Sequence, residues 1–113
     1  MPLIYKISDQ DHWDSIRNES NYNGSKIDEN DGFIHFSTQE QLQETLEKHY
    51  KGQKNLLLIA VNSEDLGPEL KWEPARDGAL FPHLYGPLQK AHIVWEKPII
   101  DTPQGTHCLP NGI

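Results

Sequence analysis

The first hydrophobic segment of the chain, residues 3–7 (LIYKI), alternates with a period of two. Ile4 and Lys6 fall on one face of an extended strand, and the other three residues fall on the opposite face. The segment is also rich in residues that favour strands. The pattern therefore predicts the first strand of the protein here.

The segment at residues 32–38 (GFIHFST) has the same period, but its two faces differ in character. Ile34 and Phe36 point one way, while His35 and Ser37 share the other face with an aromatic ring. This predicts a strand with one apolar face and one face that carries an imidazole and a hydroxyl.

Helical spacing appears twice in the first half of the chain. In residues 8–20, Trp13 and Ile16 are three apart and follow a Ser-Asp pair suited to an N-cap; an Asn-Gly turn comes after the segment. In residues 38–50 the leucines recur at helical intervals, and Thr and Gln at the start have the spacing of a capping box. We expect these to be the two main helices.

The second half of the chain is dominated by strand patterns. Residues 56–61 (LLLIAV) form a continuous apolar run that predicts a central strand covered on both faces. Short strands are expected at 71–74 and 91–98, with strand-like pieces in the loop between them. The fold class is thus α+β, with a mostly antiparallel or mixed sheet.

Composition limits the organisation and the location of the protein. The 113 residues suffice for one domain, which we place at residues 1–100, followed by an irregular tail at 101–113 that holds the lone Cys108. No apolar run approaches the roughly 20 residues that cross a bilayer, and no basic segment precedes an apolar one at the start. We therefore expect a cytoplasmic protein.

A net charge of −7 works against non-specific binding of nucleic acid, although it leaves open a nucleotide bound in a local pocket. Part of this charge lies in residues 28–32 (DENDG), a cluster typical of a solvated face. The six histidines show no spacing of a zinc site, and there is no glycine-rich phosphate loop.

His35 and Ser37 are the first candidates for chemistry. They lie ~7 Å apart along one strand, too far for direct proton transfer, and no nucleophile elbow is present. Both side chains would instead hydrogen-bond one ligand lying across that face. The alternative is a core histidine that is satisfied by backbone groups.

Glu73 is the second candidate, because it lies between Trp72 and Pro74 in an extended segment. A carboxylate beside a large aromatic ring suggests either a raised pKa or a group that stabilises a developing cation. The alternative is a solvated glutamate at a strand end, paired with Lys71 or Arg76.

His83 and Tyr85 share one face of an extended segment that prolines at 82 and 87 make rigid. Such a loop is suited to presenting side chains to a pocket. The alternative is a tyrosine that packs at a sheet edge.

These motifs together resemble one family. The segments IYKI, GFIHFST, LLLIAV, LKWEPARDGALFPHLYGPL and HIVWEKP occur in the order and spacing of the family called DUF952, over Ile4 to Pro98. The chain is identified as a member of that family on these residues.

The resemblance implies a compact ADP-ribosyltransferase-like fold, in which two short sheets pack around a cleft that holds NAD as a substrate. On this basis His35 and Ser37 line the second strand, and Glu73 orients the ribose as its glycosidic bond breaks. His83 and Tyr85 complete the cleft.

Lys6, Trp72 and Arg76 are further ligand-binding candidates. In the resemblance, Lys6 stands where the family has a histidine, and its cation would meet a phosphate, while Tyr85 or Trp72 would pack against the base. Arg76 is a candidate because it is a polar group beyond what a fold of this size needs. The implied function is ADP-ribosyl transfer from an NAD-like ligand. The alternatives are a non-catalytic module that binds such a ligand and a protein-interaction domain; the protein partners are not specified.

Overall fold

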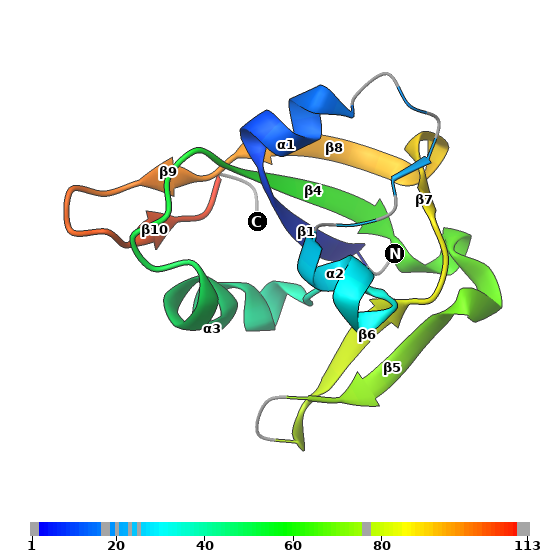
Figure 1. The fold of residues 1–113 in the computed structure, drawn as a ribbon. Coiled ribbons are helices and arrows are strands. Elements are labelled where there is room, and N and C mark those ends of the chain that lie inside the picture. The colour runs from blue at the N-terminus through cyan, green and yellow to red at the C-terminus, as the bar shows by residue number, and fades with distance from the viewer. Residues whose placement is uncertain are drawn as a thin grey trace.

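Two antiparallel sheets form the framework of the fold (Figure 1). The computed structural model describes residues 3–16, 19, 21–22, 24, 26–75 and 78–110. Within these, the first sheet is made of β1 (Leu3–Asp9), β4 (Leu56–Asn62) and β8 (Ile93–Pro98), with β4 in the centre. The second is made of β3 (Ile34–His35), β6 (Leu80–Leu84) and β5 (Leu70–Pro74), with β6 in the centre.

Two short strand pairs form sheets of their own. They join β2 (Asn21–Tyr22) to β7 (Leu88–Gln89) and β9 (Ile100–Asp101) to β10 (His107–Cys108). Single turns of 3-10 helix occur at η1 (Ser63–Asp65), η2 (Gly67–Glu69) and η4 (Lys90–His92).

Three α-helices lie in the described part of the chain: α1 (Gln10–Ser15), α2 (Lys26–Asp31) and α3 (Gln39–His49). Asp9 caps α1 by accepting the backbone N–H of His12 at 3.0 Å, and Gln41 accepts the backbone N–H of Thr38 at 3.0 Å in the predicted capping box. The α+β class with mostly antiparallel sheets is confirmed, but with three helices rather than two. The helix that was missed, α2, is short and acidic and has no amphipathic spacing.

The core lies on both faces of β4, as the continuous apolar run predicts, and all seven residues of that strand are buried. On one face, Leu42 and Leu46 of α3 pack against Leu58. On the other face, Trp13 of α1 packs with residues of the second sheet such as Ile34. Burying each such side chain stabilises the fold by ~1.5–3 kcal/mol, so α3 and the second sheet are held on opposite sides of β4.

A short backbone bridge joins the two sheets beside the predicted polar face. The N–H of Tyr5 on β1 donates to the carbonyl of Ser37 at 2.8 Å, and the N–H of Ser37 donates back at 2.8 Å. This bridge lies two residues beyond His35 and fixes the end of β3 against β1. The position of His35 relative to β1 is thereby constrained.

The C-terminal segment differs from the irregular tail that we expected. β9 and β10 form a hairpin, in which the N–H of Thr102 donates to the carbonyl of Thr106 at 3.0 Å. The buried ring of His107 bonds the carbonyl of Gln53 through Nε2 at 2.7 Å. The turn residues therefore close a hairpin that packs beside α3, and Cys108 on it is exposed. None of the described helices is long and apolar enough to span a bilayer.

Candidate functional site

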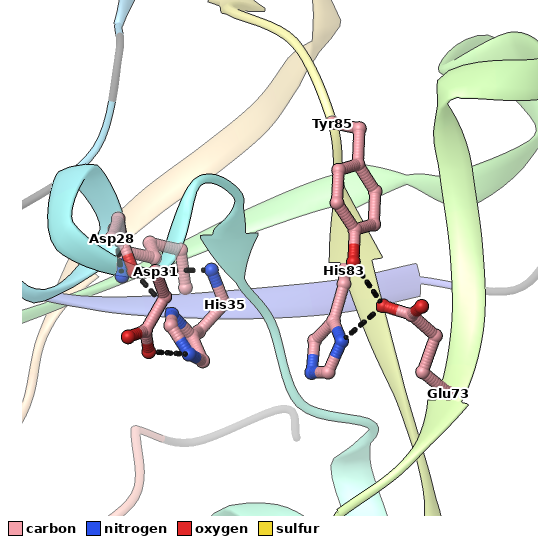
Figure 2. Close-up of polar contacts among 7 residues, drawn as sticks. Asp28, Asp31, His35, Glu73, His83 and Tyr85 are labelled. Carbon is pink, nitrogen blue, oxygen red and sulfur yellow. Dashed lines mark hydrogen bonds and ion pairs between the residues drawn. The ribbon is translucent and has the colours of Figure 1, made fainter.

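Strand pairing in the second sheet brings two histidines together. His35 on β3 is directly opposite His83 on β6, and their rings lie edge to face with centroids 5.5 Å apart. Figure 2 shows His35 beside Asp28 and Asp31, whereas His83 lies beside Glu73 and Tyr85. Each imidazole thus has its own carboxylate neighbours.

Glu73 on β5 accepts two hydrogen bonds on one carboxylate oxygen. His83 Nδ1 lies 2.8 Å from Glu73 Oε1, and the hydroxyl of Tyr85 donates to the same oxygen at 2.7 Å. Glu73 is paired in register with Phe81, so His83 is its diagonal neighbour across the two strands, within reach of a long side chain. The structure thus brings together Glu73, His83 and Tyr85, which were three separate candidates in the sequence.

The two donors set the ionisation of Glu73. The hydrogen bond from Tyr85, and then that from His83, lowers the pKa of the Glu73 carboxyl below its ordinary value, because both favour the charged form. The bond to Glu73 raises the pKa of the Tyr85 hydroxyl. The raised pKa that the sequence suggested for Glu73 is wrong. Its side chain is partly exposed, and Trp72, next to it on the strand, points to the opposite face of the sheet.

Asp28 on α2 joins three groups beneath the histidines. One oxygen, Oδ1, lies 2.6 Å from His35 Nδ1 and accepts the backbone N–H of His35 at 3.2 Å. The other, Oδ2, lies 2.7 Å from the Lys6 ammonium. The second ring nitrogen of His35, Nε2, lies 3.1 Å from Asp31. This network connects α2 to β1 and β3.

Lys6 lies beneath the site instead of lining it. Its side chain is 4% exposed, and that of Asp28 is 1% exposed. Burial lowers the pKa of the Lys6 ammonium, and the ionised Asp28 opposes that shift. The ammonium that was predicted to meet a phosphate is therefore bonded to a buried carboxylate.

Phe33 is the aromatic centre of the cluster. Its ring stacks on His83 with centroids 4.2 Å apart and an interplanar angle of 24°. It also contacts His35 at 4.6 Å and Tyr85 at 5.1 Å between ring centroids. The ring of Phe33 thus contacts both histidines.

Comparison with known proteins shows the family of this chain. The family model described as a protein of unknown function, DUF952, matches residues 7–96. The chain belongs to the DUF952 family. The identification made from the sequence motifs is confirmed.

Solved structures of one protein match almost the whole chain. The crystal structure of protein CC0527 from Caulobacter crescentus is 45% identical, with a TM-score of 0.89, and the match covers 94% of this chain and 93% of that one. The solution NMR structure of CC0527 is 46% identical with a TM-score of 0.83, covering 94% of this chain and 91% of that one. No curated protein matches the chain significantly.

Three predicted site residues are not part of the histidine cluster of this DUF952 domain. Ser37 lies 3.4 Å from Thr45 of α3, between the two hydroxyl oxygens. Trp72 is 45% exposed. Arg76 lies outside the described residues. Of the predicted site residues, His35, Glu73, His83 and Tyr85 form the cluster around Phe33, and Lys6 supports it from below.

His35 is not the core histidine of the alternative interpretation, because its side chain is 37% exposed and its ring nitrogens face carboxylates. Sequence reasoning did not select Asp28, Asp31 and Phe33. The two aspartates belong to the acidic segment that looked like a solvated face. Phe33 could have been found, since a period of two places it on the same face as His35.

A shallow hollow of about 290 Å³ lies beside the cluster of this DUF952 domain. Its wall is formed by Asp28, Glu29, Gly32, Phe33, Leu84, Gly86 and Pro87. A hollow of about 340 Å³ lies elsewhere, between α3 and the β9–β10 hairpin. Within the described residues, no group of His, Cys, Asp and Glu side chains is arranged to hold a metal ion. The first hollow adjoins the cluster at Phe33, although His35, Glu73, His83 and Tyr85 do not line it.

Proposed function

We propose that this DUF952 domain binds an NAD-like ligand and transfers its ADP-ribosyl group, with Glu73 as the catalytic carboxylate. The observation that carries this proposal is the pair of hydrogen bonds, from His83 at 2.8 Å and Tyr85 at 2.7 Å, that converge on one oxygen of Glu73. They hold the carboxylate in place and keep it ionised. The other oxygen, Oε2, makes no hydrogen bond to a described residue and is available to a ligand.

The chemistry of the reaction needs such a group. Breaking the bond between nicotinamide and ribose develops positive charge on the sugar, and a fixed anion nearby stabilises that charge without reorganising. In this proposal Oε2 of Glu73 faces the ribose. The rings of Phe33 and Tyr85 pack against the ligand. The partly exposed ring of His35, whose nitrogens are bonded to Asp28 and Asp31, forms a further wall of the site.

The arrangement of the two sheets supports the same proposal. Two small antiparallel sheets joined by the bridge between Tyr5 and Ser37 are consistent with the split core of an ADP-ribosyltransferase-like fold. We assign Ser37 a structural role, since its backbone forms the bridge and its hydroxyl approaches α3.

Charge around the site favours one half of the ligand. Lys6 is bonded to Asp28, while the carboxylates of Glu29, Asp31 and Glu73 lie at or beside the hollow and the histidines. Opposite charges attract most strongly where water is partly excluded, so the positively charged pyridinium ring fits this site better than the pyrophosphate. We place the nicotinamide-ribose half here.

A thermal-shift and turnover assay tests the function. The purified protein is screened against NAD, nicotinamide riboside, ADP-ribose and nicotinamide, and nicotinamide release is followed by chromatography. A ligand at about 100 times its dissociation constant stabilises the fold by ~2.7 kcal/mol, which is measurable for a domain of this size. We expect a shift with NAD or nicotinamide riboside and release of nicotinamide; Glu73→Gln keeps the shift and loses the release. No shift and no release with either compound refutes the proposal.

The second candidate is a non-catalytic module that binds the same class of ligand. It is favoured by Lys6, which replaces the histidine of the family motif and lies bonded to Asp28 below the site. The same assay separates the two candidates. A binding module shows the thermal shift, which His35→Ala weakens, but it releases no nicotinamide at any pH.

A further inference from the structure

The proposed function gives no role to the second ring nitrogen of His83, Nε2. The His83 side chain is 8% exposed, and its Nδ1 lies 2.8 Å from Glu73. An ionised carboxylate only accepts hydrogen bonds, so Nδ1 must carry the proton of this bond. In the neutral ring the lone pair is then on Nε2, which is the arrangement of a histidine oriented by a carboxylate to act as a base.

Nε2 of His83 points away from Glu73. It makes no hydrogen bond to any residue that the structure describes. Figure 2 shows this nitrogen on the side of the ring away from Glu73, facing His35. Among the described residues, the fully buried side-chain polar atoms without a hydrogen bond are Tyr22 Oη and His92 Nδ1, so the unbonded Nε2 of His83 reaches solvent.

The His83 ring is held firmly in this orientation. Phe33 covers one face, stacked at 4.2 Å between ring centroids, and Glu73 fixes Nδ1. Tyr85 donates to the same oxygen of Glu73 and so holds the carboxylate itself. A base that is held in one orientation needs little reorganisation to meet a reacting group.

We propose that Nε2 of His83 is the general base that activates the acceptor, and that the acceptor is a neutral hydroxyl compound, either water or an alcohol. This inference rests on the proposed function. As the acceptor oxygen bonds to C1′ of the ribose, its proton moves to Nε2. The bond between C1′ and the pyridinium nitrogen breaks, and its electron pair leaves with nicotinamide, which becomes neutral. Atoms and charge balance with no further reactant.

His35 is less suited to this role because both of its ring nitrogens are occupied. Nδ1 lies 2.6 Å from Asp28 and Nε2 lies 3.1 Å from Asp31, so each nitrogen already faces a carboxylate. The other charged or titratable groups that face His83 are Glu73 and Lys71 on β5 and Tyr85 just after β6. Of the two histidines, His83 therefore has the free nitrogen.

The test uses His83→Asn, since the asparagine amide can donate to Glu73 from the place of Nδ1 but supplies no base at the place of Nε2. We expect nicotinamide release with water as acceptor to fall by 10²- to 10⁴-fold, while the thermal shift with NAD or nicotinamide riboside is kept. Azide is already an anion and needs no base, so azide should restore release in His83→Asn. It should not restore release in Glu73→Gln, which lacks the stabilising charge.

Two measurements complete the test. His49→Asn, on the exposed C-terminal turn of α3, is the matched control and should behave as the wild type. If His83→Asn does not fold, nitrogen-15 NMR of the wild-type imidazoles decides: the proposal requires a proton on Nδ1 and none on Nε2 at neutral pH. The reverse tautomer overturns it.

The outcomes separate this inference from the proposed function. If the wild-type protein releases nicotinamide and His83→Asn is equally active with water as acceptor, His83 is not the general base. The role of Glu73 is unaffected by that result. A loss in His83→Asn that azide does not restore also overturns the base. A wild-type protein that neither binds nor cleaves the nicotinamide ligands refutes the proposed function, and the inference with it.

Discussion

Replacing Lys6 by methionine tests the buried network under the site. The Lys6 ammonium lies 2.7 Å from Asp28, and the two side chains are 4% and 1% exposed. Methionine has nearly the length of lysine without its charge, so the substitution removes the ammonium that compensates the buried Asp28 carboxylate, which keeps its bonds to His35. The change therefore removes the charge and little of the packing.

The expected loss is large for one side chain. Breaking a buried ion pair by removing one member costs ~3–5 kcal/mol, because the other charge stays buried. A domain of 113 residues is stable by roughly 6–17 kcal/mol in total, at about 0.05–0.15 kcal/mol per residue. At about 4 °C per kcal/mol, the melting temperature should fall by roughly 12–20 °C.

Urea unfolding at pH 7, followed by tryptophan fluorescence, measures this loss. Lys48→Met is the matched control, since Lys48 pairs with Glu44 on the surface of α3 at 3.4 Å and such pairs contribute only ~0.3–0.5 kcal/mol. The double variant of Lys6→Met with Asp28→Asn should recover most of the loss, because no buried charge remains. A loss below ~1 kcal/mol in Lys6→Met, or additive losses in the double variant, would refute the reasoning.

The single variant Asp28→Asn should have a stability that depends on pH. Burial already lowers the pKa of Lys6 below its ordinary value of 10.5, and removing Asp28 removes the interaction that opposes this shift. The unfolded chain then binds more protons than the folded one at every pH between the lowered pKa and 10.5, so stability rises with pH in that window. We expect the deficit of Asp28→Asn to shrink between pH 7 and pH 10; a deficit that stays constant would contradict a charged, buried Lys6.

Two further predictions concern Glu73 and the core. Tyr85→Phe removes the largest of the causes that lower the pKa of Glu73, so the NMR titration midpoint of its carboxyl should rise toward 4.5; an unchanged midpoint would mean that the bond from Tyr85 is not formed in solution. Leu58→Ala, in the fully buried centre of β4, should destabilise the fold by ~2–5 kcal/mol in urea unfolding, since the surrounding strands and α3 cannot close the cavity. A loss under ~1 kcal/mol would show that the two faces of β4 are not packed as described.

The spacing of hydrophobic residues along the sequence was enough to predict the main strands and the longest helix of this protein. The alternation at residues 3–7 separates Ile4 from Tyr5 and Ile7, and the structure places them in the two different core clusters. The apolar run at residues 56–61 predicts the central strand, and the spacing of Thr38 and Gln41 predicts the start of α3. In each case the signal is local, because strand and helix geometry determine which neighbours share a face.

The properties of the site needed the tertiary structure. The pKa of Glu73 is lowered by donors 10 and 12 residues away, and sequence alone suggested the opposite shift. The acidic segment of α2 looked like a solvated face, yet Asp28 is buried because it meets Lys6, 22 positions earlier, and His35. Charge interactions depend on distance in space and on exclusion of water. The order of the strands sets both, and periodicity carries no information about that order.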